Sequence, residues 1–348
     1  MSRQWLSRQR IFTGRIHGGM LLLALFFGGL WYFSGLSPLT EEENLLWRKV
    51  RSAQDALYAE RTERGLEPQA GTDPWKTGFP GVEWSGITTT LGPLEAKRTA
   101  ADPLWSVHAL RTFRRLGLKP GDRVAVFSSS SFPGLVFSLL SAAESLDLSV
   151  LWVHSLGSST WGANVAEFPW PEIALTLREK GFLSLKADSY TLGGGGETGR
   201  GMSPEGRDLL REAAAREGVP LLEGNSLSEI IEKKTALLRA FSPRLVITVG
   251  GSAATFGGGE DEFPFGGYYP PEEKEKYPGK GVFQNALKEG IPVLHFLNLR
   301  SLAREAGIPY DGRPVPRFSP RGGPLLSGLG LLLFLGALYL FPRWKKQP

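Results

Sequence analysis

The sequence predicts an α/β fold in which a mostly parallel sheet carries helices on both faces, a Rossmann-like three-layer arrangement, flanked by an N-terminal and a C-terminal transmembrane helix. Short apolar runs alternate with amphipathic segments through the middle of the chain, and Gly-, Ser- or Pro-rich turns separate them. That alternation predicts parallel strands joined by helices. Near each end of the chain lies an uncharged stretch of membrane-spanning length.

The first uncharged stretch covers residues 18–36. At about 1.5 Å per residue it spans a hydrocarbon core of ~30 Å. Residues 1–17 carry arginines and no acid, whereas three glutamates follow at 41–43. By the positive-inside rule the N-terminus is expected in the cytoplasm. The alternative is a cleaved signal peptide, but the apolar run exceeds the usual ~7–15 residues and no A-x-A site follows.

The second stretch covers residues 324–341, after a Pro/Arg-rich linker at 309–323 and before a basic tail at 342–348. Its aromatic and basic end predicts a return to the cytoplasm. The alternative is a buried C-terminal helix. The expectation is thus a two-pass protein of the inner or plasma membrane, held in the bilayer by two anchors. Both termini are then cytoplasmic, and an α/β domain at 40–308 is extracytoplasmic.

The charge distribution argues against nucleic acid as a partner. The chain holds 40 Lys and Arg and 35 Asp and Glu, a net charge of +5. Seven of those bases lie in residues 1–17 and 343–348, so the rest of the chain has 33 bases and 35 acids. The absence of cysteine excludes thiolate and disulfide chemistry. No metal-ligand spacing or dinucleotide fingerprint occurs, so neither a metal nor a cofactor is expected.

The predicted elements follow in order. Thr40 and Glu43 form a capping-box pattern that opens a helix over 41–64, and a Gly/Pro-rich loop covers 65–82. Gly117 ends a second helix over 99–116. Strands are then expected at 123–127, 149–154, 182–187, 219–222, 244–249 and 291–296. Helices are expected at 133–146, 170–180, 204–217, 227–240, 281–289 and 299–306, with a long Gly/Pro/acidic excursion at 257–280.

Three polar loops follow predicted strands, at 128–134, 154–164 and 250–257. Ligands of open parallel sheets bind beyond the carboxyl ends of the strands, so these loops are expected either to share a cleft or to be ordinary capped turns. A fourth segment, 88–99, adds hydroxyls and two cations that suit an anion. The candidate ligand-binding residues are Thr88, Thr89, Thr90, Glu95, Lys97, Arg98, Ser129, Ser131, Ser158, Ser159, Asn164, Gly250, Gly251 and Ser252.

A glycine run at 193–196, followed by Glu197 and Arg200, is interpreted as a surface loop or a flexible lid. Ser128, Ser130 and His154 are weak catalytic candidates for a hydrolase. No G-x-S-x-G motif supports them, and a histidine that closes a strand is more often a hydrogen-bonded core residue.

Several of these blocks resemble the poly-γ-glutamate system protein family: SGITTTLGPLEAKRTAADP (85–103), SSSSFPG (128–134), SLGSSTWGAN (155–164), MSPEGRDLL (202–210) and VGGSAATFG (249–257). The resemblance covers roughly residues 40–300 and does not extend to the second membrane segment. Members are encoded with the machinery that makes and exports poly-γ-glutamate, a polyanionic polymer. The resemblance implies a pathway and no catalytic residue.

Together these observations lead us to expect a membrane-anchored accessory component of poly-γ-glutamate biosynthesis or export. Its expected partners are the membrane subunits of the synthase or exporter, or the anionic polymer itself. The alternative is an extracytoplasmic hydrolase or transferase that acts on the polymer or on a phosphorylated small molecule.

Overall fold

The computed structural model describes residues 18–22, 24–29, 39–258, 265–318, 330–336 and 339. The chain divides into two units, which we treat separately. Residues 39–316 form an α/β unit, and residues 1–38 with 317–348 form a terminal unit.

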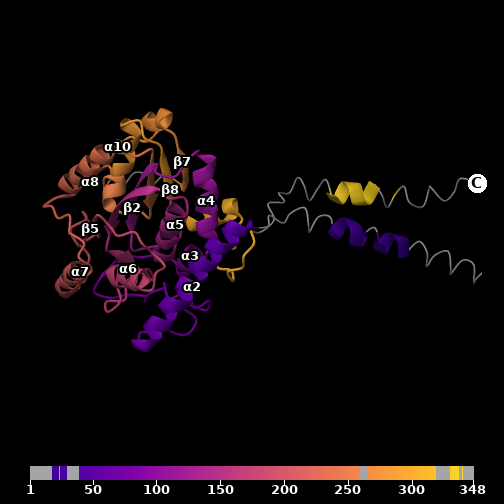
Figure 1. The fold of residues 1–348 in the computed structure, drawn as a ribbon, viewed down its shortest axis with the longest axis horizontal. Helices are drawn as coiled ribbons and strands as arrows, with labels where there is room; N and C mark the ends of the chain where they lie inside the picture. The colour runs from indigo at the N-terminus through magenta and orange to yellow at the C-terminus, as the bar shows by residue number, and fades with distance from the viewer. Residues whose placement is uncertain are drawn as a thin grey trace, which may run out of the picture. The chain divides into compact units, whose positions relative to one another are not determined.

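The α/β unit is built on a six-stranded sheet of order β5-β3-β2-β6-β8-β7 (Figure 1). All neighbouring strands are parallel except β7, which pairs antiparallel with β8 at one edge. The strands are β2 (Arg123–Ser129), β3 (Ser149–Ser155), β5 (Ser189–Thr191), β6 (Leu245–Val249), β7 (Gly267–Tyr269) and β8 (Val293–Phe296). The mostly parallel α/β prediction is therefore confirmed.

Helices cover both faces of this sheet. One face carries α5 (Pro133–Ser145) and α6 (Trp170–Glu179), and the other carries α8 (Leu227–Phe241) and α10 (Val282–Lys288) (Figure 1). Because successive side chains of a strand point to opposite faces, each buried strand contributes apolar side chains to a hydrophobic core on either side of the sheet. Ala125 and Phe127 pack with Phe283 of α10, whereas Trp152 packs against Trp170 of α6 at a ring-centroid distance of 5.9 Å.

The remaining helices are α2 (Glu41–Glu63), α4 (Leu104–Arg115), α7 (Pro204–Glu217) and α11 (Leu299–Ala306), with the short helices α3 (Leu94–Ala100), α9 (Ala253–Phe256) and η1 (Pro271–Lys276). The predicted capping box of α2 is present, with Thr40 Oγ1 accepting from the Glu43 amide. The helices predicted at 41–64, 133–146, 170–180, 204–217, 227–240, 281–289 and 299–306 agree with the structure within one residue at each end.

The single helix predicted over 99–116 is wrong, because α3 and α4 are separate. Pro103 lacks an amide hydrogen and disfavours the helical conformation of the residue before it. Asp102 fills the break, and its Oδ1 accepts from the Leu104 amide at 2.9 Å. The apolar periodicity continues across Pro103, so it predicted one helix where the proline separates two.

The strand predicted at 182–187 is also misplaced, since β5 begins at Ser189. The Glu144 carboxylate accepts from the amides of Ser184 and Leu185, at 2.5 and 2.9 Å, so these groups do not pair with β3. The strand predicted at 219–222 is reduced to one bridge between Leu221 and Tyr190. The predicted excursion at 257–280 contains the edge strand β7 and η1.

An additional parallel pair joins β1 (Thr88–Thr90) to β4 (Ser158–Ser159). This pair was not among the predicted elements, because each strand is too short to show an alternating pattern. It ties the segment before α3 to the loop after β3.

In the terminal unit, residues 18–22, 24–29, 330–336 and 339 are helical. Within the described residues, the structure contains no helix with the length and apolar character needed to cross a membrane. The other residues of the predicted spans 18–36 and 324–341 lie outside the described residues, as do the tips 1–17 and 342–348.

The loop predicted at 65–82 is held to α2 by a buried guanidinium. Arg61 is 2% exposed, and its guanidinium donates to the carbonyls of Leu66, Gly78 and Pro80 at 3.1, 3.1 and 2.6 Å. One side chain thus satisfies three backbone acceptors of a segment that has little secondary structure of its own.

We expect Arg61→Ala to lower the free energy of unfolding by about 2–4 kcal/mol, because it leaves buried carbonyls without donors and opens a cavity. The exposed Arg115→Ala variant is the control and should change it by less than ~0.5 kcal/mol. Urea unfolding of the full chain measures both values. Equal effects of the two variants would contradict this account of Arg61.

Candidate functional site

The strand order places a topological switch point between β2 and β6. From β2 the chain proceeds outward through β3 to β5, and then returns to β6 and β8 on the other side. In open α/β sheets, the loops that leave the two strands at such a point diverge and open a crevice at their carboxyl ends. The loops after β2 and β6 are the Ser-rich and Gly-rich segments identified in the sequence.

A pocket of about 700 Å³ lies at these strand ends. Its lining comes from the segments 89–97, 129–132, 155–159, 193–195, 251–258 and 297–300, together with Tyr310. The three polar loops therefore meet in one pocket, where the loop after β5 and the loop after β8 join them.

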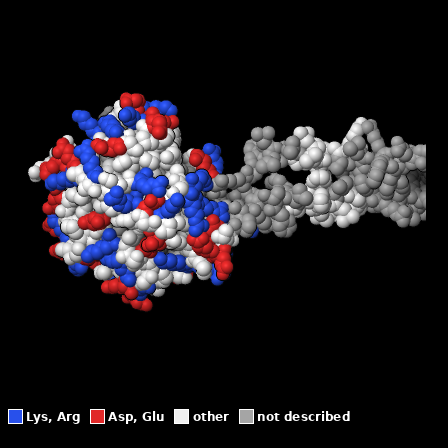
Figure 2. All heavy atoms as spheres, turned by 45° about the horizontal axis from the view of Figure 1, so that its top comes forward, with Lys and Arg blue, Asp and Glu red and all other residues white. Residues whose placement is uncertain are grey.

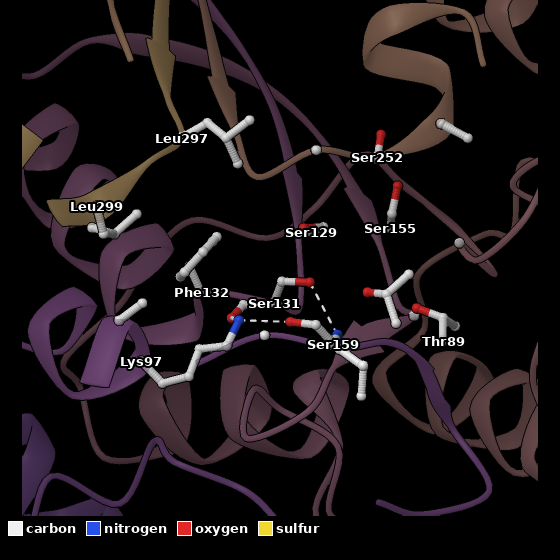
Figure 3. A pocket seen from close by; sticks show the side chains of 18 of the residues that line it. Thr89, Lys97, Ser129, Ser131, Phe132, Ser155, Ser159, Ser252, Leu297 and Leu299 are labelled. Atoms are coloured by element: carbon white, nitrogen blue, oxygen red, sulfur yellow. Dashed lines mark hydrogen bonds between the residues drawn. The ribbon is translucent and has the colours of Figure 1, made fainter. Parts of the chain in front are cut away.

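The pocket is polar on one side and apolar on the other (Figure 3). Ser129, Ser155, Ser252 and Thr89 lie toward one side of the view, and Phe132, Leu297 and Leu299 toward the other. Ser131 and Ser159 lie between them, and Lys97 lies below Phe132 with its Nζ extended toward Ser159, to which it is hydrogen-bonded. Ligand pockets commonly combine apolar walls with a few convergent polar groups.

The serine run 128–131 divides between core and pocket because strand side chains alternate. Ser128 and Ser130 turn into the interior toward His154, whereas Ser129 and Ser131 line the pocket. Ser129 is close to the backbone of Gly250, where a Cβ would lie 2.5 Å from Ser129 Oγ. Gly250 has a φ of +84°. Both this left-handed backbone conformation and the close approach of Ser129 favour glycine at position 250.

The catalytic candidates Ser128, Ser130 and His154 do not line the pocket. His154 is fully buried, with Nδ1 2.8 Å from Ser128 Oγ and Nε2 2.9 Å from Ser130 Oγ. Its ring stacks on Trp170 at 4.7 Å, and Trp152 Nε1 donates to Ser128 Oγ. Burial holds the pKa of His154 well below its usual value, so the ring is neutral. This is the hydrogen-bonded core arrangement that the sequence analysis weighed against catalysis.

Lys97 is the central cationic residue of the pocket. It is 4% exposed, and its Nζ donates to the Ser131 carbonyl and to Ser159 Oγ, both at 2.6 Å. Its Nζ also lies 3.9 Å from the centroid of the Phe132 ring. No carboxylate among the described residues pairs with it. Burial lowers the pKa of Lys97 to about 7, so both charged and neutral forms are populated near neutral pH.

Arg98, the neighbour of Lys97, points elsewhere. Its guanidinium donates to the Thr72 carbonyl at 3.0 Å and forms an ion pair with Asp311 at 3.2 Å. Glu95 is exposed and outside the pocket lining. Neither of these two candidates therefore contributes to the pocket lining.

The structure brings Thr89, Thr90, Lys97, Ser129, Ser131, Ser159, Gly251 and Ser252 of the ligand-binding candidates into the pocket lining. Thr88, Ser158 and Asn164 are instead fully buried. Asn164 Nδ2 donates to Thr88 Oγ1 at 2.9 Å, and Ser158 Oγ donates to the Ser130 carbonyl at 3.1 Å. Their role in this structure is to fix the loops that carry the lining residues.

The glycine run 193–196 is only partly packed, because Gly193 is buried, Gly194 and Gly196 are half-buried and Gly195 is exposed. Gly193 to Gly195 line the pocket, and Gly193 approaches the backbone of Gly157 so closely that a Cβ would lie 2.7 Å from the Gly157 amide nitrogen. The run leads into Glu197, which is 2% exposed. The surface-loop interpretation therefore agrees with Gly195 and not with Gly193, and the lid interpretation stays a prediction.

Glu197 forms a buried ion pair that the sequence analysis did not identify. Its Oε2 lies 3.1 Å from Lys234 Nζ, and Ser155 Oγ donates to it at 2.7 Å. Burial alone would raise the pKa of Glu197, but Lys234 and the hydroxyls of Thr191 and Ser155 outweigh it and hold the pKa at about 2. The pair joins α8 to the glycine run and to Ser155 in the pocket wall.

Arg300 is the second cation of the pocket lining and was also missed. It is exposed on α11, with its guanidinium carbon 4.7 Å from the centroid of the Tyr310 ring. The sequence did contain a signal for it. A strand was predicted at 291–296, so the rule that directed attention to the other strand ends applied equally to 297–300.

The described lining of the pocket thus carries two basic side chains and no Asp or Glu. By contrast, the face of the molecule in Figure 2 bears Lys and Arg intermixed with Asp and Glu. The purely basic character of the lining is therefore a local property of the pocket. Among the described residues, no group of His, Asp and Glu is arranged to hold a metal ion.

Comparison with protein-family models, with curated proteins and with solved structures gives no match.

We expect Lys234→Met and Glu197→Gln each to lower the free energy of unfolding by about 3–5 kcal/mol, because each leaves a buried charge unpaired. The combined variant should lose less than the sum of the two. The contribution of Glu197 should be present above pH 4.5 and disappear as the pH falls toward 2, since folding lowers its pKa.

The control for this pair lies one residue away on α8. Lys233 pairs with Glu229 at the surface, so Lys233→Met should change the free energy of unfolding by less than about 1 kcal/mol. Denaturant unfolding followed by circular dichroism compares the variants. Equal losses for Lys233→Met and Lys234→Met would contradict the structural importance of the buried pair.

Proposed function

We propose that the chain is a membrane-anchored accessory component of poly-γ-glutamate biosynthesis or export, and that its α/β unit binds a carboxylate-bearing stretch of the polymer in the strand-end pocket. The observation that carries the proposal is the pocket lining, which has Lys97 and Arg300 and no acidic side chain among its described residues. Hydroxyls of serine and threonine supply further donors.

The charge of this pocket suits a small number of carboxylates. Arg300 is exposed and offers a planar fork of donors that matches a carboxylate. Lys97 adds a cation deeper in the pocket, which is present below pH 7 and lost above it. Two cations and local hydroxyls fit a short segment or a chain end better than a long stretch of polyanion, because the face of the molecule seen in Figure 2 is of mixed charge.

The blocks that carry the family resemblance supply most of this pocket. The blocks at 85–103, 128–134, 155–164 and 249–257 all contribute lining residues. The block at 202–210 packs behind them, where the Ser203 amide donates to the Gly86 carbonyl at 3.0 Å. The resemblance and the pocket therefore concern the same residues, which favours a role for the pocket in the pathway.

The membrane part of the proposal rests on the terminal unit. Leu21, Leu22, Leu25 and Phe26 of the first described helix, and Leu331 to Leu333 of the second, are 57–68% exposed. Apolar side chains left open in this way are suited to lipid. Phe27 and Phe334 lie 6.4 Å apart in an edge-on arrangement, a contact that would suit two anchors that pack together.

We expect a fluorescent γ-linked glutamate oligomer to bind the full chain in lipid nanodiscs, and Arg300→Ala to weaken binding about tenfold, the loss of one charge-assisted contact. Arg304→Ala is the matched control, since Arg304 is exposed one turn further along α11 and does not line the pocket. It should leave the Kd within about twofold. Fluorescence anisotropy at two salt concentrations measures the effect.

Two results would contradict this proposal. One is an oligomer affinity that Arg300→Ala and Arg304→Ala change equally. The other is equal binding of an α-linked oligomer of the same charge, which would show that the pocket recognises charge without recognising the γ-linkage.

A further inference from the structure

The side chains of Lys97 and Ser159 make a contact in the pocket that anion binding does not require. Lys97 comes from α3 and Ser159 from β4, and the Nζ to Oγ distance is 2.6 Å (Figure 3). Both residues line the pocket. An amine next to a hydroxyl in a ligand pocket is one of the known arrangements of a base beside a nucleophile.

We propose that Ser159 and Lys97 form a nucleophile–base pair for acyl transfer, in which Ser159 Oγ attacks an amide or ester carbonyl of a bound carboxylate-bearing chain and Lys97 Nζ accepts the hydroxyl proton. The choice of a γ-linked chain as substrate rests on the proposed function. The pairing of the Lys97 and Ser159 side chains is independent of that function.

The surroundings of Lys97 favour the neutral amine that a base must be. The ion pairs of the described residues include none with Lys97, and Asp311 pairs with the neighbouring Arg98 instead. The other titratable groups of the pocket lining are Arg300 and Tyr310, and neither is an anion at neutral pH. In the neutral form, one N–H can donate to the Ser131 carbonyl while the nitrogen lone pair accepts from the Ser159 hydroxyl.

Ser159 is held in position by its own backbone. Its amide donates to Ser131 Oγ at 3.1 Å, and Ser159 pairs with Thr90 of β1. Space is left beside the pair by Gly92, another lining residue. A Cβ there would lie 3.1 Å from Ser159 Oγ and 3.3 Å from Lys97 Nζ. A side chain at position 92 would crowd both reacting groups.

The reaction balances with water as the only co-reactant. Ser159 Oγ forms a bond to the carbonyl carbon, its proton passes to Lys97 Nζ, and the C–N or C–O bond of the substrate breaks as Lys97 returns the proton to the leaving amine or alcohol. Water then attacks the acyl-Ser159 carbonyl and gives its proton to Lys97, which passes it to the departing Ser159 Oγ. An acceptor amine in place of water gives transfer instead of hydrolysis.

The test uses the full chain in nanodiscs and p-nitrophenyl acetate as the acyl donor, with release of p-nitrophenol and the intact mass as readouts. We expect one acetyl group per chain, located on Ser159 by peptide mapping. The acylation rate should rise through pH 7 and level above it, following the neutral form of Lys97. Ser159→Ala should abolish the adduct, and Lys97→Met should slow acylation about 10²–10⁴-fold.

Ser228→Ala and Lys274→Met are the matched controls, because both residues are exposed and lie outside the pocket lining. Neither should change the rate. Lys97→Arg keeps a cation that cannot lose its proton near neutral pH, so it should also be inactive. The pH profile of the unaltered chain remains informative if Lys97→Met does not fold.

The proposal is overturned if Ser159 is not acylated at pH 8, or if the rate is independent of pH between 6 and 8. Binding of the γ-glutamate oligomer is measured on the same preparations. Oligomer binding without acylation defeats only the nucleophile–base pair, whereas acylation without oligomer binding defeats only the polymer proposal.

Discussion

The pocket depends on one constraint, the burial of the Lys97 amine without a carboxylate partner. Its Nζ bridges the Ser131 carbonyl and Ser159 Oγ, and so joins α3 to the loop after β2 and to β4. Taking an ammonium group out of water is unfavourable, and burial accordingly lowers the pKa of Lys97 to about 7. Because both protonation states are accessible, the same side chain is able to attract an anion at lower pH and to accept a proton at higher pH.

The backbone of the surrounding elements, more than their charged side chains, shapes the pocket around Lys97. The switch point between β2 and β6 opens the crevice, and strand alternation directs Ser129 and Ser131 into it while Ser128 and Ser130 enter the core. The Glu197–Lys234 pair lies behind the wall that Ser155 contributes. The buried charges of Glu197 and Lys234 are thus paired with each other, whereas the ion pairs of the described residues include neither Lys97 nor Arg300 of the pocket lining.

Periodicity predicted the mostly parallel sheet and most helix bounds, and the strand-end rule predicted which loops would meet. The strand at 182–187 was misplaced because the Glu144 side chain competes for its amides, an interaction between residues forty positions apart. Glu197 is buried with an ion-pair partner, Lys234, that lies on α8. Arg98 forms its ion pair with Asp311, more than two hundred residues later in the chain. Local pattern indicates the direction of a backbone segment, whereas the role of a polar side chain depends on which distant groups reach it.

The most direct measurement is the titration of Lys97 itself. The full chain in nanodiscs, with ¹³C at the lysine Cε, gives one resonance per lysine, and Lys97→Arg identifies the signal of interest. The account predicts that this signal titrates with a pKa of about 7, well below the reference value of about 10.5 for a lysine side chain. A Lys97 signal that titrates together with the exposed lysines would contradict it, because the amine would then be charged throughout the neutral range.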